Sequence, residues 1–512
     1  MRYLVLLLGL LLTTTLSGQM TVHFDRPFHV AGEVAWFSVY APRPAPPKVR
    51  VVVYDPAGQV LDYFFLEAEA GAYAGHYRWP FALGTGYYRL GFAALDAAGS
   101  VTDLGTVRHA VYADKRTEAN APAPNQTGNG TRAKRPAAGG LTATVANNEL
   151  RVEGLDYSAY AVSVVNLDVV AADPVFRPTE GATTAPAAYV DTLFYPTSVQ
   201  TAAGEAVTTS LLPVFDPARY AFGFARSQEG AAVLQLAPFT GTKRVQVRDL
   251  GGQRLTPTLA LPTLPALRAT PPVTPAVARY VDLARRRRKI YQLFATVETE
   301  LEPRGRAEER QTLVPNRSFD VPNYKAFPTM YEFFREVAGE LRVRRKKDSY
   351  SARLYNAPNQ RFFGENPLYI IDGMLTRDDD YVMNLNPARV RYLAFYYVGS
   401  ELRRDFPALG NNGVVQIETV RGAENFPAAD AAEQLPINGL QARADFPARN
   451  AAGADVPVLS PLLLWDTGSG IRELTLPLPA SDDGGRYRVL VTARAADGTL
   501  RSVATVYEQA MR

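Results

Sequence analysis

The stretches PLYIIDG (residues 367–373) and GNNGVVQIET (residues 410–419) decide the fold of one part of this chain. The first is a short run of leucine, tyrosine and isoleucine that closes on an Asp-Gly turn, a pattern typical of a buried strand. In the second, Asn412 and Gly413 tolerate positive φ and predict a tight hairpin turn, which leads into a strand at residues 414–420. We therefore expect both stretches to form strands of one sheet.

The residues between these stretches complete the pattern. Asn386 and Pro387 fit the N-cap and first position of a single helical turn, and residues 390–397 indicate another strand. The series resembles the plug domain of TonB-dependent outer-membrane receptors. The chain departs from that family at residues 389–391, where Arg-Val-Arg stands in place of an acidic residue after Asn-Pro. An unrelated α/β domain with an Asp-Gly turn is the alternative interpretation. The residues that carry the resemblance are Pro367, Asp372, Gly373, Gly410 and Gly413.

Receptors of this family surround the plug with a barrel. A barrel of roughly 22 strands, each of about 9 to 11 residues, needs well over about 200 residues. This 512-residue chain ends too soon after Gly422 to supply them. The resemblance therefore implies a plug-like α/β domain at residues 325–422 without a pore of its own.

A second pattern opens the chain. Residues 22–37 read VHFDRPFHVAGEVAWF, and residues 75–79 and 86–92 alternate apolar and polar side chains as half-buried strands do. The first run resembles the opening of a macroglobulin domain of the MG2 kind, in which an Asp, a basic residue, Pro and an aromatic residue precede Gly-Glu and a strand. Short strands at regular spacing predict a β-sandwich.

Segments without apolar side chains divide the rest of the chain. Residues 116–140 contain no Val, Ile, Leu, Met, Phe, Tyr or Trp, so nothing there compensates for ordering the backbone and a flexible linker is predicted. Strand-like runs predict further sandwiches on both sides of the plug-like domain. We expect a mainly β, multidomain fold with these divisions: signal peptide 1–19, macroglobulin-like sandwich 20–115, linker 116–140, second sandwich 141–272, helix and connecting segment 273–324, plug-like domain 325–422, linker 423–435 and C-terminal sandwich 436–512.

Two helices interrupt the β pattern. Thr274 and Pro275 predict the start of one, and apolar residues recur at helical spacing after them. A capping box at residues 329–332 predicts the start of the other, which we expect to continue to Leu341 and to pack on the plug-like sheet.

The N-terminus predicts export. Residues 1–12, MRYLVLLLGLLL, form a short apolar run after one basic residue, which indicates a cleaved secretory signal. The combination of macroglobulin-like and plug-like units resembles exported envelope proteins of Gram-negative, Bacteroidota-type bacteria. The resemblance implies a location in the periplasm or in association with the outer membrane.

The composition argues against several kinds of chemistry. The chain has no cysteine, which excludes disulfides, a thiolate nucleophile and the thioester by which some macroglobulins trap proteases. All four histidines lie in the first domain, and no G-x-S-x-G or H-E-x-x-H pattern occurs. A net charge of only +4 gives no reason to expect nucleic acid as a partner. We expect no enzyme activity, no cofactor and no metal.

Charged runs supply the remaining candidates. Asp378–Asp380 offers oxygen atoms to a calcium ion, but without a spaced ligand loop it predicts a solvated turn. Arg288 falls on the apolar stripe of the first helix, so it must reach water, a carboxylate or a phosphate. A solvated helix end is the alternative interpretation of each basic run. The candidate partner-binding residues are Arg285, Arg286, Arg287, Arg288 and Lys289 in the first helix, and Arg342, Arg344, Arg345, Lys346 and Lys347 at the end of the second.

These observations favour a non-enzymatic binding or scaffold protein of the cell envelope that acts through its sandwiches and plug-like domain. The expected partner is another envelope protein, with peripheral contact to anionic lipid headgroups as an alternative. A different function remains open: an accessory factor that seats its plug-like domain in a separately encoded outer-membrane barrel for uptake or secretion.

Overall fold

A computed structural model describes most of the chain. The described residues are 19–115, 136–294, 303–304, 313–420, 433–447 and 456–511, apart from short gaps at 157, 171–174, 183–185, 187, 209, 251–252, 348 and 496. The expected signal peptide, apart from residue 19, and most of the expected linkers 116–140 and 423–435 lie outside these residues. Among the described helices, none combines the length and the apolar composition that a membrane span requires.

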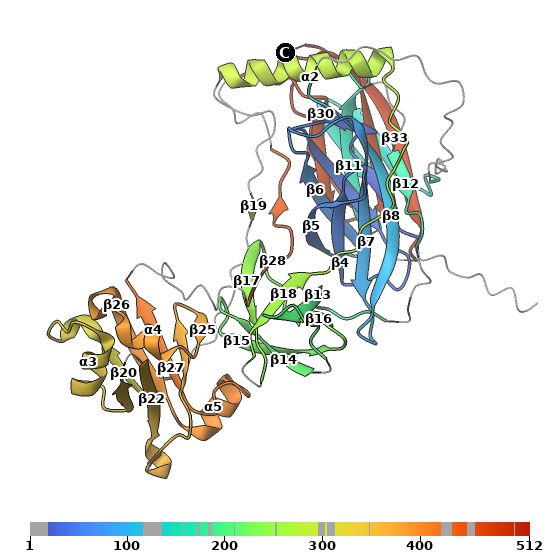
Figure 1. Cartoon of the computed structure of the whole chain (residues 1–512). Helices are drawn as coiled ribbons and strands as arrows, with labels where there is room; N and C mark the ends of the chain where they lie inside the picture. The colour runs from blue at the N-terminus through green and yellow to red at the C-terminus, as the bar shows by residue number, and fades with distance from the viewer. Residues whose placement is uncertain are drawn as a thin grey trace, which may run out of the picture. The chain divides into compact units, whose positions relative to one another are not determined.

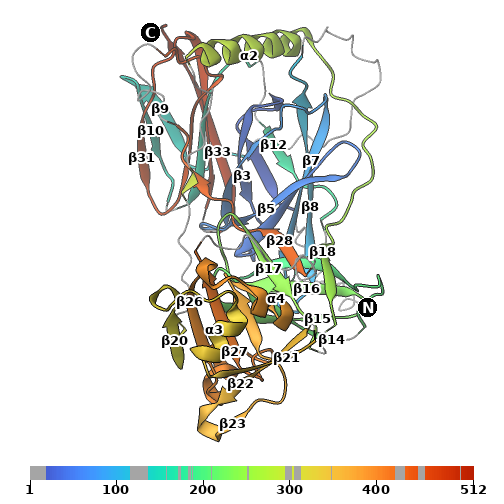
Figure 2. The same ribbon diagram turned by 60° about the vertical axis from the view of Figure 1, so that its left-hand side comes forward.

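The chain forms two compact units (Figures 1 and 2). Unit 1 comprises Met1–Thr192, Pro262–Gly305 and Leu440–Arg512, and unit 2 comprises Leu193–Leu261 and Arg306–Gly439. Both are built mainly from strands, so the expected mainly β, multidomain fold class is confirmed. Unit 2 is formed by two insertions into the sequence of unit 1.

One half of unit 1 consists of two sheets from residues 21–112, joined by β12, which lies outside the expected bounds 20–115. Its sheets have the orders β2-β8-β7-β4-β5 and β12-β1-β3-β6. Between them lies an aromatic core that includes Phe24, Phe37, Trp79 and Phe92. The strands are β1 (Thr21–Phe24), β2 (Phe28–Val30), β3 (Val34–Tyr40), β4 (Lys48–Tyr54), β5 (Val60–Glu67), β6 (Ala72–Arg78), β7 (Gly86–Leu95), β8 (Val101–Tyr112) and β12 (Val175–Pro178).

The other half of unit 1 joins strands from residues 142–166 to strands from residues 462–509. Its sheets have the orders β30-β11-β32-β33 and β31-β10-β9, and Figure 2 shows β9, β10 and β31 side by side. A short pair, β19 (Pro303–Arg304) with β29 (Arg443–Ala444), also belongs to unit 1. The strands are β9 (Thr142–Ala146), β10 (Glu149–Glu153), β11 (Ala159–Asn166), β30 (Leu462–Gly468), β31 (Glu473–Pro477), β32 (Gly485–Arg494) and β33 (Leu500–Gln509).

This pairing corrects two expected divisions. The separate sandwiches expected at 141–272 and 436–512 do not form, because β11 pairs along one edge with β30 and along the other with β32. Every residue of β11 is buried, so its backbone groups need partners on both sides. Two strands near the C-terminus supply those partners.

The helix α2 (Pro275–Leu293) lies across the ends of the unit 1 strands in both Figure 1 and Figure 2. It begins as expected, since the Thr274 hydroxyl accepts the Val277 N–H at 3.2 Å. Its buried side chains pack with residues of β2, β3, β8, β11 and β30 in one apolar cluster. The helix therefore joins the two halves of unit 1. The side chains that it buries are Val277, Tyr280, Val281, Ala284, Arg287 and Tyr291.

A buried polar network fixes α2 to residues 25–33 near the start of unit 1. Arg26 Nε lies 2.9 Å from Asp25 Oδ2, and Arg26 Nη1 lies 3.4 Å from Glu33 Oε1. The Tyr280 hydroxyl donates to Glu33 Oε1 at 2.7 Å, while the Val30 N–H donates to the other oxygen at 2.8 Å. These charges are removed from water but paired, which is the condition for burying them without a large penalty.

Unit 2 contains a small β part and an α/β domain, which we define as residues 313–420. The small β part has sheets β16-β13-β18 and β15-β14-β17-β28. Its strands are β13 (Leu193–Thr201), β14 (Ser210–Asp216), β15 (Ala221–Ser227), β16 (Ala231–Leu236), β17 (Thr242–Val247), β18 (Leu255–Leu259) and β28 (Gln434–Asn438).

The α/β domain has a five-stranded sheet of order β20-β26-β27-β24-β25, with α3 and α4 packed on one face and α5 on the other. A second sheet, β21-β22-β23, packs beside α3 and α4. The elements are β20 (Arg317–Asp320), β21 (Leu341–Lys346), β22 (Ser349–Asn356), β23 (Arg361–Phe362), β24 (Leu368–Ile371), β25 (Met374–Thr376), β26 (Val390–Tyr396), β27 (Val414–Thr419), α3 (Met330–Glu336), α4 (Asp379–Asn384), α5 (Gly399–Asp405) and the short 3-10 turns Val321–Asn323, Ala357–Asn359 and Pro387–Arg389.

Cutting the chain between residues 116 and 135 should leave the fragment 19–115 attached to the rest of unit 1. The fragment shares the β1–β12 pairing and the apolar cluster under α2 with later segments, so separation would expose both. A specific protease site inserted there, followed by cleavage and size-exclusion chromatography, tests this. Co-elution in native buffer and separation in urea are expected. Separation in native buffer would show that the first sandwich is autonomous.

Acid should destabilise unit 1. Burial, with a contribution from Arg488, lowers the pKa of His23 to about 3, and burial with Arg78 lowers the pKa of His76 to about 4. Below about pH 6.5 these histidines bind protons in the unfolded chain but stay neutral in the folded chain. The free energy of unfolding therefore falls as the pH drops from 6.5 towards 4. The readout is tryptophan fluorescence during thermal melts, because Trp36, Trp79 and Trp465 all lie in unit 1. An unchanged midpoint at pH 4.5 would contradict the prediction.

Candidate functional site

The Asp-Gly turn at the end of β24 ties together the two stretches that define the plug-like pattern. Asp372 and Gly373 have φ of 49° and 85°, the left-handed conformation that Asp tolerates and Gly favours. Asp372 accepts hydrogen bonds from the Thr419 N–H at 2.8 Å and from the Thr419 hydroxyl at 2.7 Å, and its own N–H donates to Ile417 at 2.9 Å. The carboxylate therefore fixes the end of β24 to the end of its parallel neighbour β27.

The remaining pattern residues also have structural roles. A side chain at Gly410 would place its Cβ 2.6 Å from the Phe406 Cβ, and one at Gly413, where φ is 81°, would lie 2.4 Å from Leu354. Pro367 is buried just before β24. The expected hairpin turn at 412–413 is wrong, because α5 lies between β26 and β27 and only the glycine of that pair has positive φ. The expected turn at 386–389 is confirmed, with Asn386 as its N-cap.

The small β part of unit 2 closes the edge of the five-stranded sheet. Gln246 accepts the Leu375 N–H at 2.6 Å and donates to the Leu375 carbonyl at 3.3 Å, as a neighbouring strand would. Phe215 and Tyr220 from the same part enter the apolar cluster beneath α5. An exposed strand edge invites pairing with other chains, so this contact protects β25.

The three consecutive aspartates do not form the solvated turn that the sequence predicts. Asp378 caps α4, with its Oδ1 accepting the Tyr381 N–H at 2.9 Å. Asp379 accepts the Ala352 N–H of β22 at 3.1 Å and the Tyr369 hydroxyl at 2.7 Å, and burial raises its pKa. Asp380 accepts a backbone N–H of the same strand. The carboxylates diverge, and the described residues contain no group of three metal-ligating side chains.

The second basic run lies on a strand rather than at a helix end. α3 stops at Glu336, and Leu341–Lys346 forms β21. The expected place of these cations at a helix C-terminus is therefore wrong, and the alternation of the run LRVR has the period of a strand instead. Gly339, between the helix and the strand, also favours a break.

Strand pairing gathers part of this run on one surface. In the β21–β22 hairpin, Arg342 lies opposite Arg353, while Arg344 and Lys346 lie opposite serines. Directly opposed residues share a face, and the other face buries Leu341, Ala352 and Leu354. We call the exposed surface the basic face, which consists of Arg342, Arg344, Lys346 and Arg353.

The charges of the basic face have few internal partners. Arg342 lies over the Phe362 ring, with its guanidinium carbon 5.5 Å from the ring centre. Among the ion pairs of the described residues, none involves the basic face. Like charges opposite each other on paired strands destabilise a hairpin, as Arg342 and Arg353 do here. Arg345 points to the other side and lies over Tyr350, and Lys347 lies in the hairpin turn.

The first basic run belongs to unit 1 and serves mainly to dock α2. Arg287 is buried beside Tyr280, with its guanidinium carbon 5.3 Å from the ring centre. Arg288 pairs with the Asp114 carboxylate and donates to the Ala31 carbonyl at 3.1 Å, which confirms the expectation that it must meet a polar group. Arg285 is half-buried near the same carboxylate, and only Arg286 and Lys289 are exposed. Most of this run is therefore not a docking surface.

Sequence reasoning missed Arg353. It stands alone in the run SYSARLYN and becomes part of the basic face only through its pairing with β21. The alternation of small or apolar and polar residues in that run was the available signal for a strand.

The comparisons with known proteins are weak. No family model and no curated protein matches the chain. Among solved structures, Escherichia coli alpha-2-macroglobulin activated by porcine elastase is 10% identical with a TM-score of 0.24, over 96% of this chain and 44% of that one. Salmonella alpha-2-macroglobulin reacted with methylamine is 11% identical with a TM-score of 0.25, over 96% and 40%. The chain spans less than half the length of either. At such scores the likeness carries no argument, so the macroglobulin-like and plug-like resemblances stay predictions.

Replacing Asp372 with Ala should destabilise unit 2 by about 1–3 kcal/mol, because two donors on Thr419 lose their acceptor. Urea unfolding followed by far-UV circular dichroism measures the loss. Asp372→Asn is the matched control, since Asn tolerates positive φ and keeps one oxygen acceptor, so it should lose less. The urea midpoint followed by tryptophan fluorescence, which reports on unit 1, should be the same in the variant and the parent. Equal stability of the Ala variant and the parent would refute the role of this turn.

Proposed function

We propose that this protein is a non-enzymatic binding or scaffold protein of the bacterial cell envelope, and that its α/β domain holds an acidic partner protein on the basic face. The observation that carries the proposal is the exposed pairing of Arg342 with Arg353, flanked by Arg344 and Lys346. Such an arrangement is unfavourable in the free domain and becomes favourable when carboxylates lie over it.

The basic face is held rigidly from behind. Ala352 and Leu354 are buried in the domain core, and Asp379 and Asp380 accept backbone N–H groups of the same strand. A surface that is already ordered loses little conformational entropy on binding. The folded domain has therefore already ordered this surface before a partner binds.

The chemistry of the face favours a protein partner over a membrane. Three of its four cations are arginines, whose planar guanidinium groups bind carboxylates with two parallel hydrogen bonds. Surfaces that bind membranes usually combine basic residues with exposed apolar ones. Among the described residues of β21, β22 and β23, no large apolar side chain is exposed.

The location in the envelope rests on the signal-like residues 1–12. The alternative function is that of an accessory factor whose α/β domain seats in a separately encoded outer-membrane barrel, and in that case the barrel carries the acidic surface. It rests on the plug-like pattern of 367–373 and 410–419 and on the basic face, and it adds a prediction about the partner's class.

The triple variant Arg342→Ser, Arg344→Ser and Lys346→Ser should bind poly-L-glutamate at least about tenfold more weakly than the parent chain, with a flatter dependence on salt. Calorimetric titration at two ionic strengths measures both quantities. The matched control carries the same loss of charge on exposed residues of unit 1, as Arg268→Ser, Arg286→Ser and Lys289→Ser, and should bind like the parent.

Vesicles of phosphatidylglycerol in neutral lipid serve as the competing probe. Binding of the parent chain to these vesicles but not to poly-L-glutamate would overturn the choice of an acidic protein. Equal weakening in both triple variants would show that net charge alone, rather than the basic face, drives binding. Circular dichroism confirms that each variant is folded.

A further inference from the structure

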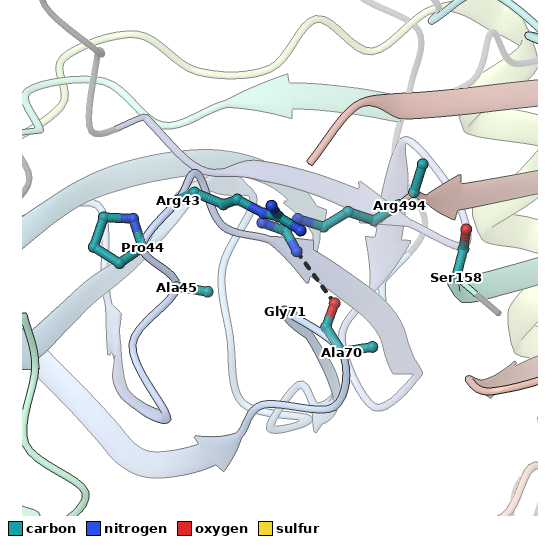
Figure 3. A pocket seen from close by; sticks show the side chains of 8 residues that line it. Arg43, Pro44, Ala45, Ala70, Gly71, Ser158 and Arg494 are labelled. Atoms are coloured by element: carbon teal, nitrogen blue, oxygen red, sulfur yellow. Dashed lines mark hydrogen bonds between the residues drawn. The ribbon is translucent and has the colours of Figure 1, made fainter. Parts of the chain in front are cut away.

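Unit 1 contains a hollow that is lined by two arginines. Its volume is about 670 Å³, and it forms where the loop after β3, the turn before β6, the start of β11 and the end of β32 meet. Figure 3 shows the side chains of Arg43 and Arg494 extending towards each other across it. The residues that line it are Arg43, Pro44, Ala45, Ala70, Gly71, Ser158, Arg494 and Ala495.

Arg494 is the central group of this hollow. Its residue is only 4% exposed, and its Nη1 donates to the Ala70 carbonyl at 3.2 Å. Its Nε and Nη2 are buried and have no hydrogen-bond partner among the described residues. A buried guanidinium normally donates to carboxylates or carbonyls. Two buried donor atoms without acceptors therefore reduce the stability of the fold.

A second cation faces this group in place of a counter-ion. Burial lowers the pKa of Arg494, and the charge of Arg43 lowers it further. The Asp497 carboxylate interacts electrostatically with Arg43, but its hydrogen bond is with the Thr499 N–H, at 2.8 Å. Among the described ion pairs, none joins a carboxylate to Arg43 or Arg494. Two guanidinium groups in one hollow repel each other unless an anion lies between them.

Ser158 lines another part of the hollow, beside the backbone end of Arg494 in Figure 3. It is 3% exposed, and its hydroxyl is buried with no partner among the described residues. Two guanidinium groups that approach from different sides suit a tetrahedral oxyanion better than a planar carboxylate, because its terminal oxygens point in different directions. The alanines and the proline of the lining leave room for the organic body of a ligand.

We propose that the hollow between Arg43 and Arg494 binds the phosphate or sulfate ester group of a small organic molecule through the two guanidinium groups. The site lies wholly within unit 1 and does not depend on the function proposed for the α/β domain. Gly71 keeps it open, because a Cβ there would lie 2.0 Å from the Arg494 Nη1 and φ is 78°.

Calorimetric titration of the full chain with phenyl phosphate, phenyl sulfate and benzoate tests the site. We expect at least one ester to bind, and Arg43→Met to weaken that binding by about tenfold or more, because a charged pair of hydrogen bonds is lost. Arg43 is exposed, so this variant should fold. Arg268→Met, which removes an exposed arginine of the same unit, is the matched control and should bind like the parent.

The esters identify the source of the oxyanion, since binding of the phosphate alone or the sulfate alone assigns the group. Gly71→Ala should also weaken binding, and its melting temperature shows whether the unit stays folded. Three results would overturn the proposal: binding of neither ester, tighter binding of benzoate than of both esters, or equal affinity in the parent and in Arg43→Met.

Discussion

The pairing of β11 is the constraint on which the organisation of this chain depends. Every residue of β11 is buried, and its backbone meets β30 on one edge and β32 on the other. A buried strand cannot leave those groups unpaired. The chain must therefore return to unit 1 after Leu440, and unit 2 must form from the segments between. Its insertion follows from where the partners of one strand lie in the sequence.

The middle segment of unit 1, Pro262–Gly305, is held by side-chain packing instead of strand pairing. The segment that contains α2 adds no strand to the large sheets and instead covers an apolar cluster shared by both halves. Its polar contacts are specific, since Tyr280 donates to Glu33 and Arg288 pairs with Asp114. Buried charges tolerate few arrangements, so these contacts select one position of the helix on a surface that apolar packing alone would fix less sharply.

The features that the sequence predicted correctly are local. Thr274 caps α2 and Asn386 caps the turn after it, as expected, and strands begin at Val390 and Val414 as expected. Helix caps and short apolar runs depend on neighbouring residues, so the sequence shows them directly. The errors are long-range. No local signal shows that β11 pairs with strands near the C-terminus, or that Arg353 completes the basic face. The fold class could be predicted from the strand-like runs and their spacing, but the division into units could not.

Arginine has opposite roles in the two units, and burial separates them. Arg287 and Arg288 lie against Tyr280 and Asp114, so their charges serve the fold of unit 1. The cations of the basic face are exposed, and no ion pair among the described residues joins them to a carboxylate. Net charge is only +4 over the whole chain, so no long-range field gathers partners. Screening limits attraction between exposed charges to about 8 Å in physiological salt. Recognition by this face must therefore depend on direct contact, and the geometry of the hairpin decides which acidic surface fits.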